Sequence, residues 1–192
     1  MNRPVGSYHY DTVLRDHARA QLNRFTRITQ PLGDLRAAAV AVVITADNDE
    51  GSVLLTRRAS SLRAHSGQWA LPGGRLDLGE SAEEAALREL TEEVNLELPK
   101  TSVLGLLDDY NTRSGYRITP VVVWADRDAQ GLSPNPSEVA SIHTAPFSEL
   151  AKKGLAHFQP NKSEGTEILS VRLSLDQIFA PTAAVLYQFR EV

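Results

Sequence analysis

Short apolar runs alternate with polar segments along this chain, and their spacing predicts both strands and helices. Residues 37–45 form an apolar run rich in valine, which indicates a buried strand. Further strands are predicted at 53–56, 102–107, 116–124 and 168–173, and residues 138–143 lead into another short strand. Pro120 lies inside one of these runs, and because proline cannot donate to a ladder it predicts an edge or bulge position.

Three segments carry helix signals. Asp11 can cap a helix through about Thr26, with apolar residues at helical spacing, and we favour a packing helix over a lid or a dimer arm. Ser81 followed by Glu84 is a capping box, and Asn95 suits a left-handed C-terminal cap. A last helix begins near Pro181. Mixed strands and helices predict one α/β domain over residues 1–192, with its N-terminal helix at about 11–26.

Two connecting segments have a marked composition. Residues 47–51 are acidic but lack the full calcium-loop pattern, so a hairpin turn is the better interpretation. Residues 57–69 predict a loop that carries Arg57, Arg58 and Arg63 and runs into a tight turn at 72–74. The loop is either an anion-binding segment or a solvated one.

The helix that follows carries a face of carboxylates. Glu89, Glu92 and Glu93 are three and four residues apart, so they share one side of the helix. Clustered carboxylates repel one another unless a cation lies among them, and oxygen ligands suit Mg²⁺ or Mn²⁺. The alternative is a solvated acidic face on which Arg88 forms ordinary i,i+4 pairs.

Composition narrows the class of protein. The chain has 192 residues, a net charge of −4 and no cysteine. The charge argues against nucleic acid or an anionic membrane as a partner, and the lack of cysteine excludes a disulfide framework and thiolate chemistry. The start of the chain has no apolar run of signal-peptide length, so we expect a cytoplasmic location.

The spacing around the acidic helix resembles the Nudix box. Gly74, Glu80 and the run 88–96 fit its specified positions, except that Asn95 stands where the family has glycine. Asparagine accepts positive φ too, so the departure is mild. The resemblance implies a Nudix-type α/β/α sandwich with a mixed central sheet.

A narrower resemblance is to the coenzyme A diphosphatases of this family. It rests on the segment 54–74 and on 135–139, which places that group's glutamate on Glu138. Leu71 stands where the signature has phenylalanine. Residues 179–181 replace the Trp-Gly that usually precedes Thr-Ala, here Thr182 and Ala183.

These resemblances imply metal-dependent hydrolysis of the pyrophosphate bond of coenzyme A or acyl-coenzyme A, to 3′,5′-ADP and 4′-phosphopantetheine. Mg²⁺ or Mn²⁺ would be held by Glu89, Glu92, Glu93 and the Gly73 carbonyl. Arg88 would orient the carboxylates, and the general base is Glu89, Glu92 or Glu138. Arg58 and Arg63 are the candidates for phosphate contacts.

Other interpretations remain open at this stage. The substrate could be ADP-ribose, a dinucleotide or an oxidised nucleotide, or the chain could be a nucleotide-sensing module without catalysis. The intact glutamates argue against the sensor. A homodimer is possible.

Overall fold

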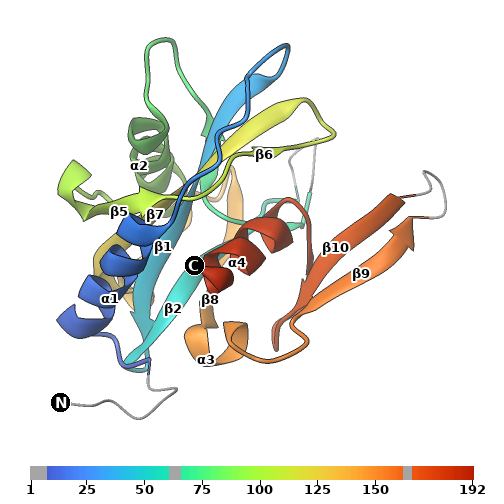
Figure 1. Ribbon diagram of the computed structural model, residues 1–192. Helices are drawn as coiled ribbons and strands as arrows, with labels where there is room; N and C mark the ends of the chain where they lie inside the picture. Colours follow the sequence, from blue (N-terminus) through green and yellow to red (C-terminus); the bar gives the residue numbers. More distant parts are fainter. Residues whose placement is uncertain (1–7, 61–65, 162–165) are drawn as a thin grey trace.

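The computed structural model of the protein describes residues 8–60, 66–161 and 166–192 (Figure 1). Eight strands form the central sheet: β1 (Arg36–Asp47), β2 (Glu50–Arg58), β3 (Trp69–Ala70), β4 (Gly73–Arg75), β5 (Val103–Leu106), β6 (Tyr110–Asn111), β7 (Tyr116–Asp128) and β8 (Val139–Pro146). The order is β3-β2-β1-β7-β5, with β4 paired to β1, β6 to β7 and β8 to β2. Since β1 and β7 are parallel and the other pairs antiparallel, the predicted mixed sheet is confirmed.

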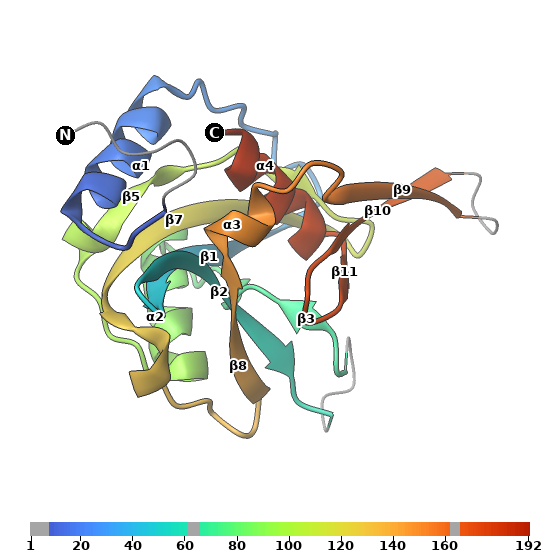
Figure 2. The same cartoon turned by 90° about the horizontal axis from the view of Figure 1, so that it is seen from below.

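Helices cover both faces of this sheet (Figure 2). Helix α2 (Ala82–Val94) lies on one face, and α1 (Thr12–Arg24), α3 (Phe147–Leu150) and α4 (Thr182–Glu191) lie on the other. Single-turn 3-10 helices follow at Lys100–Ser102 and Ala129–Gly131. Helix α1 begins as predicted, because the Asp11 side chain accepts a hydrogen bond from the Leu14 amide. The three layers give the expected α/β/α architecture.

The core is divided by the sheet, as the alternation of side chains on a strand requires. Ala41 and Val43 of β1 pack against α2 together with Leu90 and Val94. On the opposite face, Val42 and Ile44 of β1 pack in the cluster that contains side chains of α1 and α4. Because both faces of β1 are covered, its apolar run is continuous.

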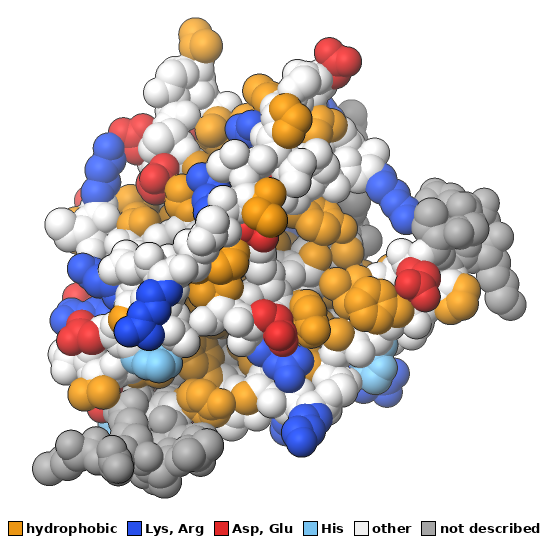
Figure 3. Space-filling view, viewed as in Figure 1, with side chains coloured by type: hydrophobic (Ala, Val, Ile, Leu, Met, Phe, Trp, Pro, Cys, Tyr) orange, Lys and Arg blue, Asp and Glu red, His pale blue; other side chains and the backbone are white. Residues whose placement is uncertain are grey.

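A second sheet was only partly predicted. Its strands are β9 (Ala156–Asn161), β10 (Thr166–Arg172) and β11 (Gln177–Phe179), in the antiparallel order β11-β10-β9. Strand β10 matches the run 168–173, whereas β9 and β11 were not predicted. The β9–β10 hairpin projects from the body of the molecule (Figures 1 and 2). Apolar side chains gather over it on the face shown in Figure 3.

Pro120 does not lie at an edge of the sheet, so the edge alternative of its prediction was wrong. Strand β7 runs between β1 and β5, and Pro120 is paired with Val40 in the parallel ladder. Its carbonyl accepts from the Leu107 amide on the other side of the strand. Pairing on that side is interrupted between β5, which ends opposite Val121, and β6, which begins opposite Ile118. An interior proline is tolerated there because no residue of β5 or β6 pairs with it, so the backbone N–H that proline lacks is not needed for the ladder.

Residues 47–51 form the predicted hairpin turn between β1 and β2. Asn48 and Asp49 have φ of 49° and 63°, the left-handed values that a two-residue hairpin turn requires. No helix in the described part of the chain is long and apolar enough to cross a membrane. The extent of a single domain over residues 1–192 stays a prediction.

Candidate active site

Of the three glutamates in the second half of helix α2, two point inward and one points outward. The predicted capping box is present: Ser81 accepts from the Glu84 amide, and Glu84 accepts from the Ser81 amide. The helix ends at Asn95 in a left-handed conformation, with φ 55° and ψ 40°. On this helix Glu89 and Glu93 are buried, while the side chain of Glu92 is half exposed.

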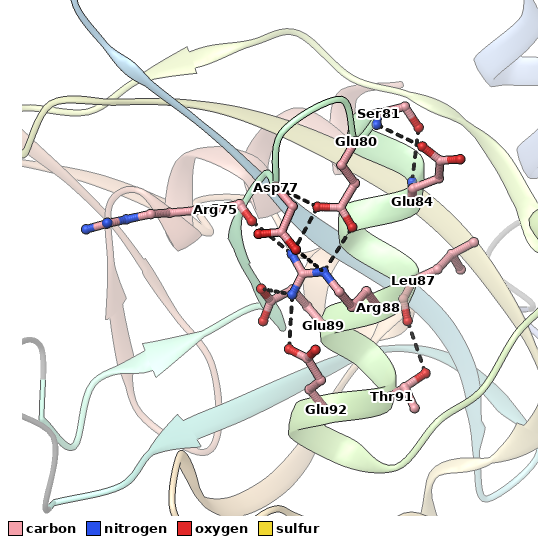
Figure 4. A network of polar contacts seen from close by, with 10 residues as sticks. All are labelled: Arg75, Asp77, Glu80, Ser81, Glu84, Leu87, Arg88, Glu89, Thr91 and Glu92. Carbon is pink, nitrogen blue, oxygen red and sulfur yellow. Dashed lines mark hydrogen bonds and ion pairs between the residues drawn. The ribbon is translucent and has the colours of Figure 1, made fainter.

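Arg88 lies at the centre of a polar network (Figure 4). Its Nε and Nη2 donate to the two carboxylate oxygens of Glu80, at 2.9 and 3.1 Å. Its Nη1 donates to Glu89 at 2.8 Å and to Glu92 at 3.0 Å, and its Nη2 reaches the Arg75 carbonyl at 2.9 Å. Charge-assisted hydrogen bonds of this kind fix the orientation of the acceptors. The hydrogen bond from Arg88 also lowers the pKa of Glu80.

The two glycines before α2 belong to β4 and not to the tight turn that was predicted. Gly73 and Gly74 pair with Val40 and Ala39 of β1. A Cβ atom on Gly73 would lie 2.3 Å from the Ala39 carbonyl oxygen, and one on Gly74 would lie 2.1 Å from Glu89 Oε1. Both positions need glycine because the strand passes close to the β1 backbone and to a carboxylate.

Gly73→Ala should therefore destabilise the protein by about 1–3 kcal/mol, the usual range for overpacking. The clash is with backbone atoms of β1, which cannot move aside as a side chain can. The matched control is Gly131→Ala, since a Cβ there meets no atom within 4 Å; it should change stability by less than about 0.5 kcal/mol. Urea unfolding measures both, and equal stability of the two variants would contradict the assignment of Gly73 to a paired strand.

Negative charge concentrates between α2 and the turn before β8. Burial raises the pKa of Glu93 to about 8, helped by the nearby charge of Glu89, while Arg58 and the Gly73 backbone act in the opposite direction. Burial also raises the pKa of Glu89, against the hydrogen bond from Arg88. The charge of Glu138 contributes to both shifts, so the three carboxylates are electrostatically coupled.

Glu138 reaches this site because its turn is attached to the end of α2. The Asn135 amide donates to the Glu93 carbonyl at 2.8 Å, and Asn95 Nδ2 donates to Ser133 Oγ at 3.3 Å. The Glu138 carbonyl in turn accepts from the Ala59 amide at 2.8 Å, just beyond β2. Sequence reasoning placed this glutamate by resemblance alone, since it is remote from α2 along the chain.

The donor chemistry of this site fits a hard divalent cation. Burial, together with repulsion from the neighbouring carboxylates, raises the pKa values of Glu89 and Glu93, and a cation would stabilise their charged forms. Among the residues that the structure describes, however, no three Asp, Glu, His or Cys side chains are gathered closely enough to form a metal centre. Glu92 instead points to Arg88 (Figure 4). A cation would therefore recruit Glu92 from its ion pair with Arg88.

A cavity of about 650 Å³ lies beside the glycines of β4. Residues of strands β1, β3 and β4, of the segment 112–116 and of the segment 176–182 line the cavity. Arg58 lines the cavity, and its buried Nε has no hydrogen-bond partner among the described residues. The Arg58 side chain as a whole is only partly buried, so its guanidinium can pair with an anionic ligand in the cavity.

The basic segment before β3 differs in part from its prediction. Arg57 and Arg58 belong to β2, and Trp69 belongs to β3, so only the residues between them can form the loop. Arg63 lies outside the described residues. The exposed side chain of Arg57 lies over Trp69, with its guanidinium carbon 5.6 Å from the ring centroid. It is Arg58 that faces Glu93 and the cavity.

Several cavity residues were not predicted from the sequence. Trp69 donates from Nε1 to Asp176 at 3.0 Å, which joins β3 to the segment before β11. Arg75 donates to the Tyr116 hydroxyl. These residues carry no motif, and only the pairing of distant strands brings them together. The sequence signal closest to them was the altered segment 179–181, which does line the cavity.

Comparison with known proteins agrees with this geometry. The family model described as NUDIX domain matches residues 35–183. An uncharacterized Nudix hydrolase NudL of Pectobacterium atrosepticum is 40% identical over 164 residues, covering 83% of each chain. Nudix hydrolase 3 of Caenorhabditis elegans is 36% identical over 134 residues, which are 68% of this chain and 56% of that protein. A solved MutT/nudix family protein of Enterococcus faecalis has a TM-score of 0.57 at 19% identity, covering 93% of this chain and 69% of that one, and shows the same fold.

The chain therefore belongs to the Nudix family. It is a Nudix hydrolase, an enzyme class that cleaves nucleoside diphosphate derivatives and generally requires a divalent cation such as Mg²⁺ or Mn²⁺. The roles of the individual glutamates, of Gly73 and of the arginines stay predictions.

Proposed function

We propose that the protein hydrolyses the pyrophosphate bond of coenzyme A or acyl-coenzyme A, releasing 3′,5′-ADP and 4′-phosphopantetheine or its acyl derivative. The observation that carries the proposal is the arginine-lined cavity next to the coupled carboxylates of α2. The resemblance of segments 54–74 and 135–139 to the coenzyme A diphosphatase signature supports the same substrate.

The residues divide the work between binding and proton transfer. Arg58 is only partly buried and lines the cavity, so its guanidinium can meet a pyrophosphate oxygen there, as a guanidinium pairs well with phosphate. Arg88 keeps Glu89 and Glu92 oriented through its hydrogen bonds. A carboxylate then accepts the proton of the attacking water, and the leaving phosphate takes up the released charge.

Mg²⁺ or Mn²⁺ bound by Glu89, Glu92, Glu93 and the Gly73 carbonyl would supply charge neutralisation at the pyrophosphate and activation of the water. For the base, the candidates are Glu89, Glu92 and Glu138. Glu138 is favoured by its place on a turn outside α2, because Arg88 does not bind it and its carboxylate is only half-buried.

A hydrolysis assay with a panel of nucleoside diphosphate derivatives tests the substrate. We expect coenzyme A and acyl-coenzyme A to be preferred over ADP-ribose, dinucleotides and oxidised nucleotides in kcat/KM. A preference for ADP-ribose would overturn the coenzyme A proposal and leave the enzyme class unchanged. Absence of turnover on every substrate with either metal would favour a nucleotide-sensing module.

Arg63→Ala tests whether the loop before β3 contacts the 3′-phosphate of coenzyme A. Loss of one charged hydrogen bond costs about 1.5–3 kcal/mol, or roughly ten- to a hundredfold in kcat/KM. The loss should appear with coenzyme A and be small with 3′-dephospho-coenzyme A, which lacks that phosphate. Equal losses on the two substrates would assign Arg63 to the pyrophosphate or to the shape of the loop.

A further inference from the structure

Strand β4 separates Arg75 from the carboxylate network. A Cβ on Gly74 would point at Glu89, so the side chain of the next residue along the strand points to the opposite face. Figure 4 shows the Arg75 side chain extending away from Arg88, Glu89 and Glu92. Arg88 contacts only the backbone carbonyl oxygen of Arg75. The side chain of Arg75 lines the cavity.

Tyr116 gathers two guanidinium groups at this end of the cavity. Its hydroxyl accepts from Arg75 Nε at 3.0 Å and from Arg75 Nη2 at 2.6 Å. The Arg36 guanidinium lies over the same ring, 4.1 Å from the centroid. Over the described ranges, neither arginine forms an ion pair with a carboxylate. Two positive charges therefore converge without compensation, in a protein whose net charge is negative.

Hydroxyl groups complete this end of the cavity. Thr112 and Ser114 line it next to Tyr116, and their side-chain oxygens lie 3.1 Å apart. Arg75 has five N–H groups, and its two bonds to Tyr116 leave others free for a ligand. Guanidinium donors with neighbouring hydroxyls match a phosphate monoester, which presents several acceptor oxygens and up to two negative charges.

We propose that Arg75, held by Tyr116 and supported by Arg36, Thr112 and Ser114, forms a second anion subsite that binds a phosphate monoester on the ribose of the substrate. On strand β4, Arg75 pairs with Ala38 and Gly73 pairs with Val40. Gly73 and Arg75 are therefore two strand residues, or roughly 7 Å, apart. In this proposal the pyrophosphate lies near Gly73 and Arg58, and the additional phosphate lies near Arg75. Arg63 is the competing candidate for that phosphate, and comparing Arg63→Ala with Arg75→Gln on coenzyme A and 3′-dephospho-coenzyme A decides between the two arginines.

The identity of this phosphate as the 3′-phosphate of coenzyme A rests on the proposed function. The subsite itself does not, because a nucleotide product can probe it without any turnover. Isothermal titration with 3′,5′-ADP and with AMP compares two ligands that differ by that phosphate alone.

We expect the wild-type protein to bind 3′,5′-ADP at least tenfold more tightly than AMP, the lower end expected for a charged hydrogen bond. Arg75→Gln should bring the two dissociation constants within about threefold by removing that bond. Tyr116→Phe keeps the ring under Arg36 but removes the acceptor that positions Arg75, so an intermediate preference is expected. Arg24→Gln, an exposed arginine on α1, is the matched control and should behave as wild type.

Equal binding of the two nucleotides to the wild type, or an unchanged preference in Arg75→Gln, overturns the subsite. If Arg75→Gln lowers the melting temperature, the test rests on Tyr116→Phe, and an unchanged preference for 3′,5′-ADP in that variant overturns the subsite. Hydrolysis of coenzyme A and 3′-dephospho-coenzyme A is measured in parallel. Failure to hydrolyse coenzyme A, together with a preference for 3′,5′-ADP that Arg75→Gln removes, rejects the proposed substrate and retains the subsite.

Discussion

Glu93→Gln is expected to lower kcat by orders of magnitude while the protein remains folded. Glu93 is 3% exposed and lies beside Glu89 and Glu138, where only a carboxylate can give a cation both charge and oxygen ligands. An amide keeps the shape of the side chain and removes the charge. Whether the enzyme uses one metal ion or two, the substitution removes the same proposed ligand, so the expected loss of kcat is large in either case.

The fold should tolerate this change because of the pKa of Glu93. Burial first, and Glu89 second, raise it to about 8, so without metal the folded protein carries a proton there at pH 7. The unfolded side chain releases that proton near pH 4.3. Between these two pH values the folded state therefore binds more protons than the unfolded state. As a result, the stability of the metal-free wild type falls as the pH rises from about 4.3 to 8. Glu93→Gln removes this contribution to the pH dependence.

Kinetics and thermal unfolding in the presence and absence of Mg²⁺ measure both effects. Glu97→Gln is the matched control, since Glu97 is exposed just beyond α2. It should retain wild-type kcat and metal dependence. A near-normal rate for Glu93→Gln with unchanged metal dependence would remove Glu93 from the proposed ligands and leave it as a buried structural acid.

Removal of divalent cations is the second change with a large expected effect. In excess chelator, hydrolysis should fall to background, because without a cation the clustered carboxylates repel the pyrophosphate and no metal activates the attacking water. Addition of Mg²⁺ or Mn²⁺ beyond the chelator should restore it. The wild-type melting temperature should also rise with metal, as for any ligand that binds only the folded state. Full turnover in excess chelator would exclude a metal-dependent reaction.

Local signals in the sequence predicted α2 and its surroundings well. The capping box of Ser81 and Glu84 and the left-handed Asn95 are set by neighbouring residues, so they can be recognised without the fold. The continuous apolar run of β1 likewise reports its burial on both faces. These local features are also the ones that hold the glutamates of the Nudix box.

Long-range pairing explains what the sequence did not predict. Gly73 and Gly74 form a strand only because β1 lies beside them, and the residues next to them in sequence give no signal of that pairing. Pro120 is tolerated inside the sheet because pairing on one side of β7 is interrupted between β5 and β6, and that interruption depends on two other strands. Arg75 and Tyr116 meet through their separate pairing with β1. Three-residue strands such as β4 and β11 have too few residues for a periodic signal.

The cavity takes none of its lining from α2. Its walls come from segments such as 112–116 and 176–182, which lie outside the Nudix box in sequence. Mutations that reshape the cavity therefore need not disturb the residues that cleave the substrate, and specificity and hydrolysis can diverge separately during evolution. For an engineer, the same arrangement makes these two segments the place to redirect the enzyme to a new nucleotide while leaving its hydrolytic machinery alone.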